Sequence, residues 1–270
     1  MKLIAVIQAR MGSTRLPGKV MAPLSGAPLL QRLIERIQAA RTELEVVVAT
    51  SVDAGDDDIR ALCRWLGVRC VSGHPTDLLD RHLQAAREAK ADVVAKIPSD
   101  CPLIDPDVID RVLRAFLDAP QRYEYVSNLH PSSWPDGNDV EVVPRAVLER
   151  AWREAGRPHE REHTTPFLWD QPWRFRVGNV SWESGLDLSM SHRFTVDYPE
   201  DLAFVQEVYD GLWRSDRPIF RLAEILTFLD RRPDVFALNA AFAGVNWYRH
   251  HLQDLSTVRA DATRRPQPAA

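Results

Sequence analysis

Cysteine is scarce in this chain of 270 residues, whose three cysteines are Cys63, Cys70 and Cys101. They are too few and too scattered for a disulfide framework, which favours a reducing compartment, and we expect a cytoplasmic protein. No apolar run approaches the roughly 18 residues that a membrane span needs, and the first one ends at Gln8, so we expect neither a signal segment nor a membrane partner. Charge of one sign is not in excess, since 34 basic and 38 acidic residues give a net charge of −4. This balance argues against a nucleic-acid coat and a polybasic membrane anchor, so we expect no nucleic-acid partner.

What the chain does contain is an ordinary globular composition, with 45% hydrophobic and 27% charged residues. In its first half, short apolar runs typical of buried strands occupy residues 3–8, 45–49, 68–71 and 93–97. Helical spacing of apolar residues occupies residues 29–39, 57–66, 77–89 and 107–117. This alternation predicts a mostly parallel, Rossmann-like α/β sheet flanked by helices. Ligands bind such sheets at the carboxyl ends of the strands, which directs attention to the loops at residues 9–17 and 98–106.

The middle of the chain differs in composition. Residues 123–183 hold five of the eight tryptophans, with strand-like pieces at residues 139–143 and 174–180. We interpret this region as a smaller inserted antiparallel or lid region that also forms a subunit contact. A returning core strand at residues 193–196 and helices at 199–211 and 221–230 follow. We expect a single domain over residues 1–256 and a disordered tail over residues 257–270.

The first loop has the character of a phosphate-binding loop. It follows a predicted buried strand and contains Gly12 together with Arg10, Arg15 and Lys19, and the chain has only four lysines. Backbone N–H groups and hydroxyls can surround phosphates while the cations neutralise them. It is not a Walker A loop, because five residues separate Gly12 from Gly18 and Val20 stands where Ser or Thr would bind Mg²⁺. A solvated basic turn is the alternative.

Two aspartates, Asp100 and Asp197, each follow a predicted apolar strand. Carboxylates at the ends of neighbouring strands can meet at the edge of a sheet and hold a hard divalent cation through oxygen. The alternative for each is the N-cap of the helix that follows.

Five segments resemble the cytidylyltransferases that make CMP-activated sugar acids, including the acylneuraminate and 3-deoxy-manno-octulosonate enzymes, and in particular the branch of the spore-coat polysaccharide cytidylyltransferases. They are Ile7–Lys19 (IQARMGSTRLPGK), Lys96–Pro106 (KIPSDCPLIDP), Asp136–Val142 (DGNDVEV), Arg161–Pro166 (REHTTP) and Thr195–Leu202 (TVDYPEDL). The resemblance implies a nucleotidyltransferase fold and a homodimer. It implies an enzyme that transfers CMP from CTP to an anionic acceptor with release of pyrophosphate.

The same resemblance assigns roles to residues. It implies that Arg10, Ser13, Arg15 and Lys19 hold the triphosphate, that Asp100 and Asp197 ligate Mg²⁺, and that Arg10, Lys19, Asp100 and Asp197 serve catalysis. The nucleotide-binding set expected from loop and resemblance together is Gln8, Ala9, Arg10, Gly12, Ser13, Arg15, Lys19 and Gly73, the last of these near the cytosine.

The acceptor is expected on the middle region. The candidate acceptor-binding residues are Lys96, Asp139, Glu141, Arg161 and His163. Asp139 and Glu141 alternate along a strand-like piece and so point the same way. Lys96 stands where an arginine is common in this branch, so the charge is kept but the bidentate fork is lost. A salt-bridge cluster is the alternative for the whole set.

Three other functions compete with this one. His159–His163 (HEREH) satisfies the zinc-peptidase pattern, but Gly156, Pro158 and Pro166 leave little helix around it. A sugar-nucleotide-dependent glycosyltransferase needs an acidic D-x-D pair at a strand end, and Asp56–Asp58 contains these letters but opens a helix and resembles a capping run. A non-catalytic nucleotide-binding relative would not need the full set of Arg10, Lys19, Asp100 and Asp197.

Overall fold

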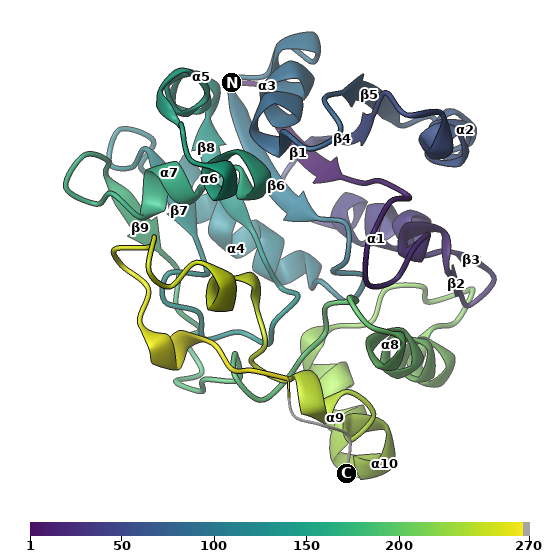
Figure 1. Cartoon of the computed structure of the whole chain (residues 1–270). Coiled ribbons are helices and arrows are strands. Elements are labelled where there is room, and N and C mark those ends of the chain that lie inside the picture. Colours follow the sequence, from purple (N-terminus) through teal and green to yellow (C-terminus); the bar gives the residue numbers. More distant parts are fainter. Residues whose placement is uncertain (267–270) are drawn as a thin grey trace.

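The computed structural model describes residues 1–266, which are organised around a central sheet (Figure 1). Within these residues the sheet has seven strands, in the order β5-β4-β1-β6-β8-β7-β9, and β8 alone runs antiparallel to its neighbours. The strands are β1 (Leu3–Gln8), β4 (Glu45–Ser51), β5 (Arg69–Gly73), β6 (Val93–Pro98), β7 (Tyr125–Ser127), β8 (Glu141–Pro144) and β9 (Val177–Asn179). A small antiparallel pair, β2 (Pro23–Leu24) and β3 (Ala27–Pro28), stands apart from it. The mostly parallel α/β fold predicted from the sequence is confirmed.

Helices cover both faces of this sheet. They are α1 (Leu29–Gln38), α2 (Asp57–Leu66), α3 (Leu78–Glu88), α4 (Pro106–Leu117), α5 (Arg145–Glu154), α6 (Pro158–His163), α7 (Pro166–Trp169), α8 (Pro199–Leu212), α9 (Leu222–Arg231) and α10 (Pro233–Phe236). Alternate residues of β1 separate two cores: Ala5 and Ile7 pack with α1, α2 and α4, whereas Ile4 and Val6 pack with α3, α5 and α7. Successive side chains of a strand point to opposite faces, so an uninterrupted apolar run belongs to a strand buried on both sides.

The four predicted helices of the first half are confirmed, and two of them begin at a capping aspartate. Asp77 accepts a hydrogen bond from the Asp80 N–H, and Asp105 accepts one from the Asp107 N–H. Each carboxylate satisfies one backbone donor that the first helical turn leaves without a partner. These caps lie in the loops after β5 and β6, so they also fix where those loops leave the sheet.

Residues 123–183 extend the central sheet instead of forming a separate insertion. β8 pairs antiparallel with β6, where Lys96 lies opposite Glu141, and β7 and β9 continue from it. The predicted returning strand at residues 193–196 is wrong. This segment contacts loops, with Phe194 N–H donating to Asp136 O at 2.7 Å and Val196 N–H to Asp100 O at 2.8 Å. Gly137 permits this approach, because a Cβ there would lie 2.8 Å from the backbone of Phe194.

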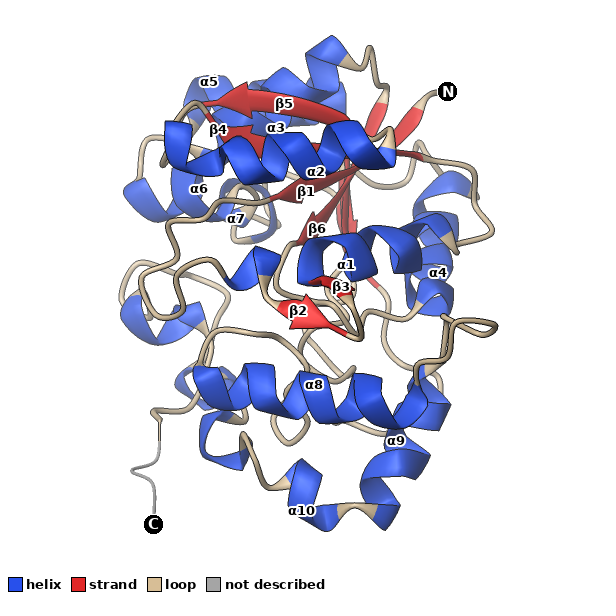
Figure 2. Cartoon of the chain, turned by 90° about the vertical axis from the view of Figure 1, so that its right-hand side faces the viewer, coloured by secondary structure: helices blue, strands red, loops and turns tan. Residues whose placement is uncertain are grey.

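A third core lies beyond the sheet, where α8, α9 and α10 pack together (Figure 2). The chain then returns through the 3-10 turns η3 (Ala240–Phe242), η4 (Trp247–His250) and η5 (Ala260–Ala262); the other two are η1 (Lys19–Met21) and η2 (Ala54–Asp56). In residues 1–266 no helix is both long and apolar enough to cross a bilayer.

The expectation of a disordered tail from residue 257 is wrong for the part that the structure describes. The Thr257 N–H and hydroxyl both donate to Asp170 Oδ1 at 2.7 Å, and the Arg264 N–H donates to Gly244 O at 2.8 Å. The polar composition that suggested disorder instead supplies partners for a buried carboxylate. Residues 267–270 lie outside the described residues.

Candidate active site

A cavity of about 920 Å³ opens at the carboxyl ends of β1 and β6. Its walls come from three places: the ends of these strands, the loops and strands of residues 128–193, and a C-terminal segment of residues 244–262 that we call the strap (yellow in Figure 1). Of the residues predicted for the site, the cavity is lined by Gln8, Arg15, Lys96, Asp100, Asp139, Glu141, His163 and Asp197. Eight of the residues predicted for the site thus share one cavity.

The Asp56 carboxylate fixes the first loop through a hydrogen bond from the Met11 N–H. Its carboxylate accepts hydrogen bonds from Met11 N–H at 2.7 Å, Ser51 N–H at 3.1 Å and Thr50 Oγ1 at 3.0 Å. Burial would raise the pKa of Asp56, but these donors outweigh it and the pKa is lowered. Asp56 occupies the N-cap position of α2, as the sequence predicts, but its side chain makes no capping hydrogen bond and instead fixes the loop.

The Lys19 ammonium contacts both predicted metal ligands. Its Nζ lies 2.9 Å from Asp100 Oδ2, 3.0 Å from Asp197 Oδ1 and 2.6 Å from Val196 O. Burial alone would lower the pKa of Lys19, but the two carboxylates outweigh it and the pKa is raised. Burial likewise opposes the charge of Asp197, yet Lys19 and Arg15 hold the pKa of Asp197 far below its ordinary value. Neither aspartate serves as a helix cap here, and three charges converge on one point.

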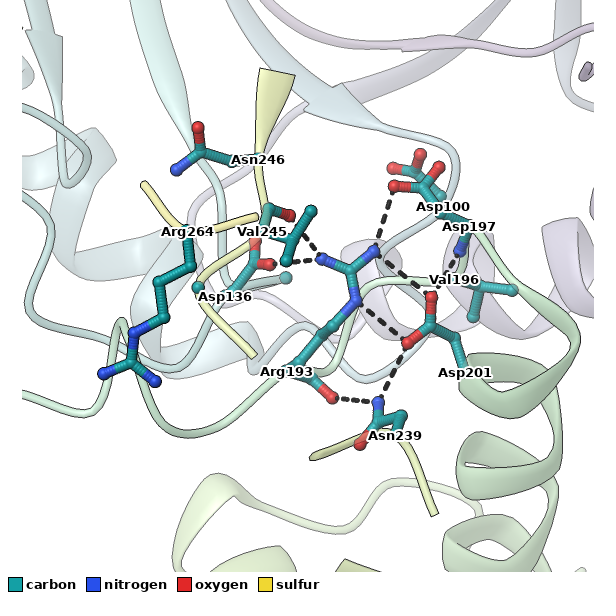
Figure 3. Close-up of polar contacts among 12 residues, drawn as sticks. Asp100, Asp136, Arg193, Val196, Asp197, Asp201, Asn239, Val245, Asn246 and Arg264 are labelled. Carbon is teal, nitrogen blue, oxygen red and sulfur yellow. Dashed lines mark hydrogen bonds and ion pairs between the residues drawn. The ribbon is translucent and has the colours of Figure 1, made fainter. Parts of the chain in front are cut away.

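Arg193, which the sequence analysis missed, fixes the orientation of the Asp197 carboxylate (Figure 3). The residue is 2% exposed, and its guanidinium donates to Asp197 Oδ2 at 3.0 Å, Asp201 Oδ1 at 2.9 Å and Asp136 Oδ2 at 3.2 Å. It also donates to Val245 O at 2.8 Å, which joins the centre to the strap. Asp201 completes the support by accepting the Asp197 N–H at 2.9 Å. The signal was the position of Arg193, four residues before Asp197.

The other residues predicted to bind nucleotide lie beside the cavity and do not line it. Ala9 is buried in the core, Ser13 Oγ accepts the Leu16 N–H at 3.4 Å, and Gly12 lies in the same turn. Arg10 reaches Pro75 O at 3.5 Å, across the loop after β5. Gly73 packs closely under Arg81, since a Cβ there would lie 2.9 Å from Arg81 Cγ.

Arg81 is a second buried cation that the sequence analysis missed. It is 1% exposed, and its Nε and Nη1 have no hydrogen-bond partner among residues 1–266. Burial and the nearby Arg10 lower the pKa of Arg81 to about 10. Gln8 Oε1, also without a partner in the described part of the chain, lies on the cavity side of β1. Unsatisfied buried polar atoms of this kind are typical of sites that a polar ligand completes.

The acceptor candidates divide into two groups. Lys96 forms a buried ion pair with Glu141, whose second oxygen accepts the Tyr125 hydroxyl at 2.6 Å. Arg161 does not line the cavity: its Nε donates to Asp77 Oδ2 at 2.9 Å and its Nη1 to Trp152 O at 2.7 Å, as in the salt-bridge alternative.

Asp139 lines the cavity as a partly buried carboxylate and has no ion-pair partner among the described residues. Burial, with the carboxylates of Asp100 and Glu141 nearby, raises the pKa of Asp139 to about 6. Burial and the neighbouring Asp139 also hold the pKa of Asp136 well above its ordinary value. This wall of the cavity therefore offers oxygen acceptors whose charge water no longer stabilises.

Aromatic rings form the opposite wall. The His163 ring stacks on Trp247 of the strap at a centroid distance of 3.8 Å, and the His130 ring stacks on Trp169 at 3.9 Å. Burial, with the Lys96 ammonium nearby, lowers the pKa of His163 to about 3, so this ring is neutral at pH 7. The sequence analysis did not assign the strap to the site, because Trp247 and Tyr248 line the cavity only once this segment has folded back against the sheet.

The geometry argues against the two motif-based alternatives. Glu160 accepts the N–H groups of Gly156 at 3.0 Å and Arg157 at 2.9 Å, so it caps its own six-residue helix and is no general base. His163 faces Trp247, whereas His159 packs beside His251. Asp56 is 2% exposed and occupied by the first loop, so it cannot belong to the metal-binding pair of a glycosyltransferase.

Comparison with known proteins agrees with this geometry. The cytidylyltransferase family model matches residues 4–224. The chain is 31% identical over 237 residues to the spore coat polysaccharide biosynthesis protein SpsF of Bacillus subtilis, covering 86% of this chain and 95% of that protein. It is 38% identical over 149 residues to the 3-deoxy-manno-octulosonate cytidylyltransferase of Bdellovibrio bacteriovorus, covering 53% and 58% of the two chains.

Solved structures give the same result. A cytidylyltransferase from Leptospira borgpetersenii superposes with a TM-score of 0.82 at 29% identity, covering 87% of this chain and 97% of that one. A CMP:2-keto-3-deoxy-manno-octonic acid synthetase complexed with CTP shares the fold, with a TM-score of 0.57 at 19% identity and coverage of 78% and 99%. The chain therefore belongs to the cytidylyltransferase family and is a nucleotidyltransferase.

Proposed function

We propose that this enzyme transfers CMP from CTP to an anionic small-molecule acceptor in a Mg²⁺-dependent reaction. An acceptor oxygen bonds to the α-phosphorus while the bond from that phosphorus to the bridging oxygen breaks. Pyrophosphate leaves, and the acceptor gives up its proton to solvent. The observation that carries the proposal is the convergence of Lys19, Asp100 and Asp197 at the end of the sheet beside the first loop.

The same convergence supports a divalent cation. Two carboxylates from distant parts of the chain share a single cationic partner, the Lys19 ammonium, which stands in for a metal ion between them. Carboxylate oxygens are the ligands that Mg²⁺ prefers, so Asp100 and Asp197 would hold it. When bound, Mg²⁺ would neutralise the charge that develops on the phosphates.

The residues of the chain itself supply positioning and charge. In the free enzyme Lys19 and Arg15 are paired with Asp197, at 3.0 Å and 2.6 Å. A triphosphate offers these cations new partners, so we expect Lys19 and Arg15 to turn from the carboxylates to the phosphates when CTP binds. Arg193, held by Asp201, keeps Asp197 in place through this exchange.

The acceptor occupies the part of the cavity between β8 and the strap in this proposal. The unpaired Asp139 would accept hydrogen bonds from hydroxyls, and the rings of Trp169 and Trp247 would cover an apolar face of a sugar. Arg249 and Arg259 of the strap supply positive charge there for an anionic group. One relative is named for an anionic sugar, 3-deoxy-manno-octulosonate, which makes sugar acids the first class to test.

The test begins with melting curves of the protein with each of the four ribonucleoside triphosphates, with and without Mg²⁺. A ligand at about 100 times its dissociation constant adds roughly 2.7 kcal/mol of stability. We expect a shift selective for CTP that Mg²⁺ enlarges, and pyrophosphate release from CTP with one member of a panel of sugar acids. Asp100→Asn is the matched variant and should lose the Mg²⁺ effect. A response to diphosphate sugars alone would favour a glycosyltransferase, and CTP binding without turnover would indicate a non-catalytic relative.

Two further parts of the proposal concern context. The three cysteines are free thiols, which suits a cytoplasmic enzyme.

The proposed homodimer would use the region 123–183, in which Trp173 is 67% exposed. Sedimentation equilibrium measures the oligomeric state directly.

A further inference from the structure

The failed zinc-peptidase motif leaves one histidine in an unexpected cluster. His159 of α6 packs beside His251 of the strap, with ring centroids 5.0 Å apart. Asp254, one turn further along the strap, places Oδ2 3.6 Å from His251 Nδ1. One nitrogen or oxygen atom from each of the three residues lies within 4.8 Å of the other two. None of the three lines the cavity that holds Asp100 and Asp197.

We propose that His159, His251 and Asp254 form a binding site for a divalent transition metal ion, Zn²⁺ by preference. Two imidazoles and one carboxylate are a common zinc set, with the fourth tetrahedral position left to water. Imidazole nitrogen selects such ions over Mg²⁺, which takes oxygen ligands. The site is therefore chemically distinct from the carboxylate pair at Asp100 and Asp197.

The geometry needs little adjustment to close around an ion. Zinc bonds of about 2.0–2.1 Å place tetrahedral ligand atoms roughly 3.4 Å apart. His159 is 4% exposed and fixed by its helix, whereas the side chains of His251 and Asp254 are 27% and 57% exposed. The two residues of the strap can therefore move toward the fixed one. Arg157 approaches the cluster, but its Nη1 donates to the Asp254 carbonyl at 2.8 Å and leaves the carboxylate free for a metal.

The consequence of this site is mechanical. His159 lies on α6, whose His163 stacks against Trp247, and Trp247 is part of the cavity wall. His251 and Asp254 follow Trp247 within the strap. A metal ion would therefore tie the strap to α6 just outside the cavity and hold Trp247 against His163. The ion would stabilise the cavity wall on the acceptor side and would take no part in transfer of the nucleotide.

The test uses the full chain, stripped of metal by a chelator and titrated with Zn²⁺ by calorimetry in an excess of Mg²⁺. Co²⁺ serves as a spectroscopic probe, because a tetrahedral nitrogen and oxygen site gives it intense visible absorption. We expect one Zn²⁺ per chain, and we expect Zn²⁺ to slow proteolytic cleavage within the strap. His251→Ala and Asp254→Asn should each weaken binding by at least about 10- to 100-fold, the range seen even for partners outside the ligand shell.

Two controls locate the site. His250→Ala removes the exposed neighbour of His251 and should leave Zn²⁺ affinity unchanged. Asp100→Asn should also leave it unchanged, so this result does not depend on the proposed reaction. The proposal is overturned if no saturable binding occurs, if His251→Ala binds as the wild type does, or if Asp100→Asn abolishes binding. Melting curves of each variant without metal confirm that it folds.

Discussion

Arg193 binds one oxygen of the Asp197 carboxylate and leaves the other free for different partners. Arg193 Nη2 lies 3.0 Å from Asp197 Oδ2, whereas Oδ1 pairs with Lys19 and Arg15. The carboxylate is thus fixed by a buried cation on one side and presented on the other. Because Arg193 also binds Asp136 and Asp201, one guanidinium forms ion pairs with three carboxylates.

Arg193→Met should therefore lower the free energy of unfolding by about 3–5 kcal/mol, the usual cost of leaving a buried charge without its partner. Urea denaturation measures this. Arg232→Met is the control, because its ion pairs lie at the exposed surface and should contribute far less to the free energy of unfolding. Equal losses in the two variants would contradict the role given to Arg193.

Lys19→Met removes the cation that occupies the space between Asp100 and Asp197. We expect Mg²⁺ to raise the melting temperature of this variant more than that of the wild type, because the metal no longer competes with an ammonium. CMP transfer should nevertheless fall by about 100-fold or more, since a group that neutralises phosphate charge is lost. Lys2→Met, at an exposed lysine, should change neither measurement. An unchanged transfer rate in Lys19→Met would remove Lys19 from the site.

Asp56→Asn tests the support of the first loop. An amide cannot accept all the donors that reach this carboxylate, so we expect about 1–3 kcal/mol less stability and a higher KM for CTP. Steady-state kinetics and urea denaturation provide the two readouts. Asp57→Asn alters an exposed neighbour and should leave KM unchanged. A loss of stability without any change in KM would mean that Asp56 stabilises the fold alone.

The acidic wall makes stability depend on pH. The pKa of Asp139 is about 6 in the folded chain, against about 4 for an unfolded aspartate. The folded state therefore binds more protons between these values, and ionisation of Asp139 lowers stability as pH rises through this window. Asp139→Asn should exceed the wild type in free energy of unfolding by about 1–3 kcal/mol at pH 8 and match it near pH 4. A gap of the same size at both pH values would contradict the shifted pKa.

The sequence predicted the first half of the fold closely because its signals are local. The strand Leu3–Gln8 and the helix Asp57–Leu66 have the bounds that apolar patterning gave them. Glycine, lysine and aspartate at predictable strand ends then indicated the candidate site. Residues 193–196 misled the prediction because Phe194 and Val196 are apolar and the whole segment is buried as a strand would be, yet its partners are loops.

The rest of the site could not be predicted, because it depends on contacts between distant segments. Apart from its spacing of four residues before Asp197, nothing local distinguishes Arg193 from a surface arginine, and its role follows from three carboxylates brought together by the fold. Arg161 was assigned to the acceptor by its motif, but an aspartate 84 residues away binds it. The prediction of disorder from residue 257 was wrong for the same reason, because the polar residues there contact buried partners only after the chain folds back.

The span between Lys19 and Asp197, 178 residues, also sets the order in which the enzyme can come into being. A nascent chain that has left the ribosome only as far as β9 can pair all seven strands of the sheet but still lacks Asp197. Contacts so distant in sequence form late and slow the search for the native state. The proposed nucleotide and metal site is therefore completed after the sheet, when the last quarter of the chain folds against it.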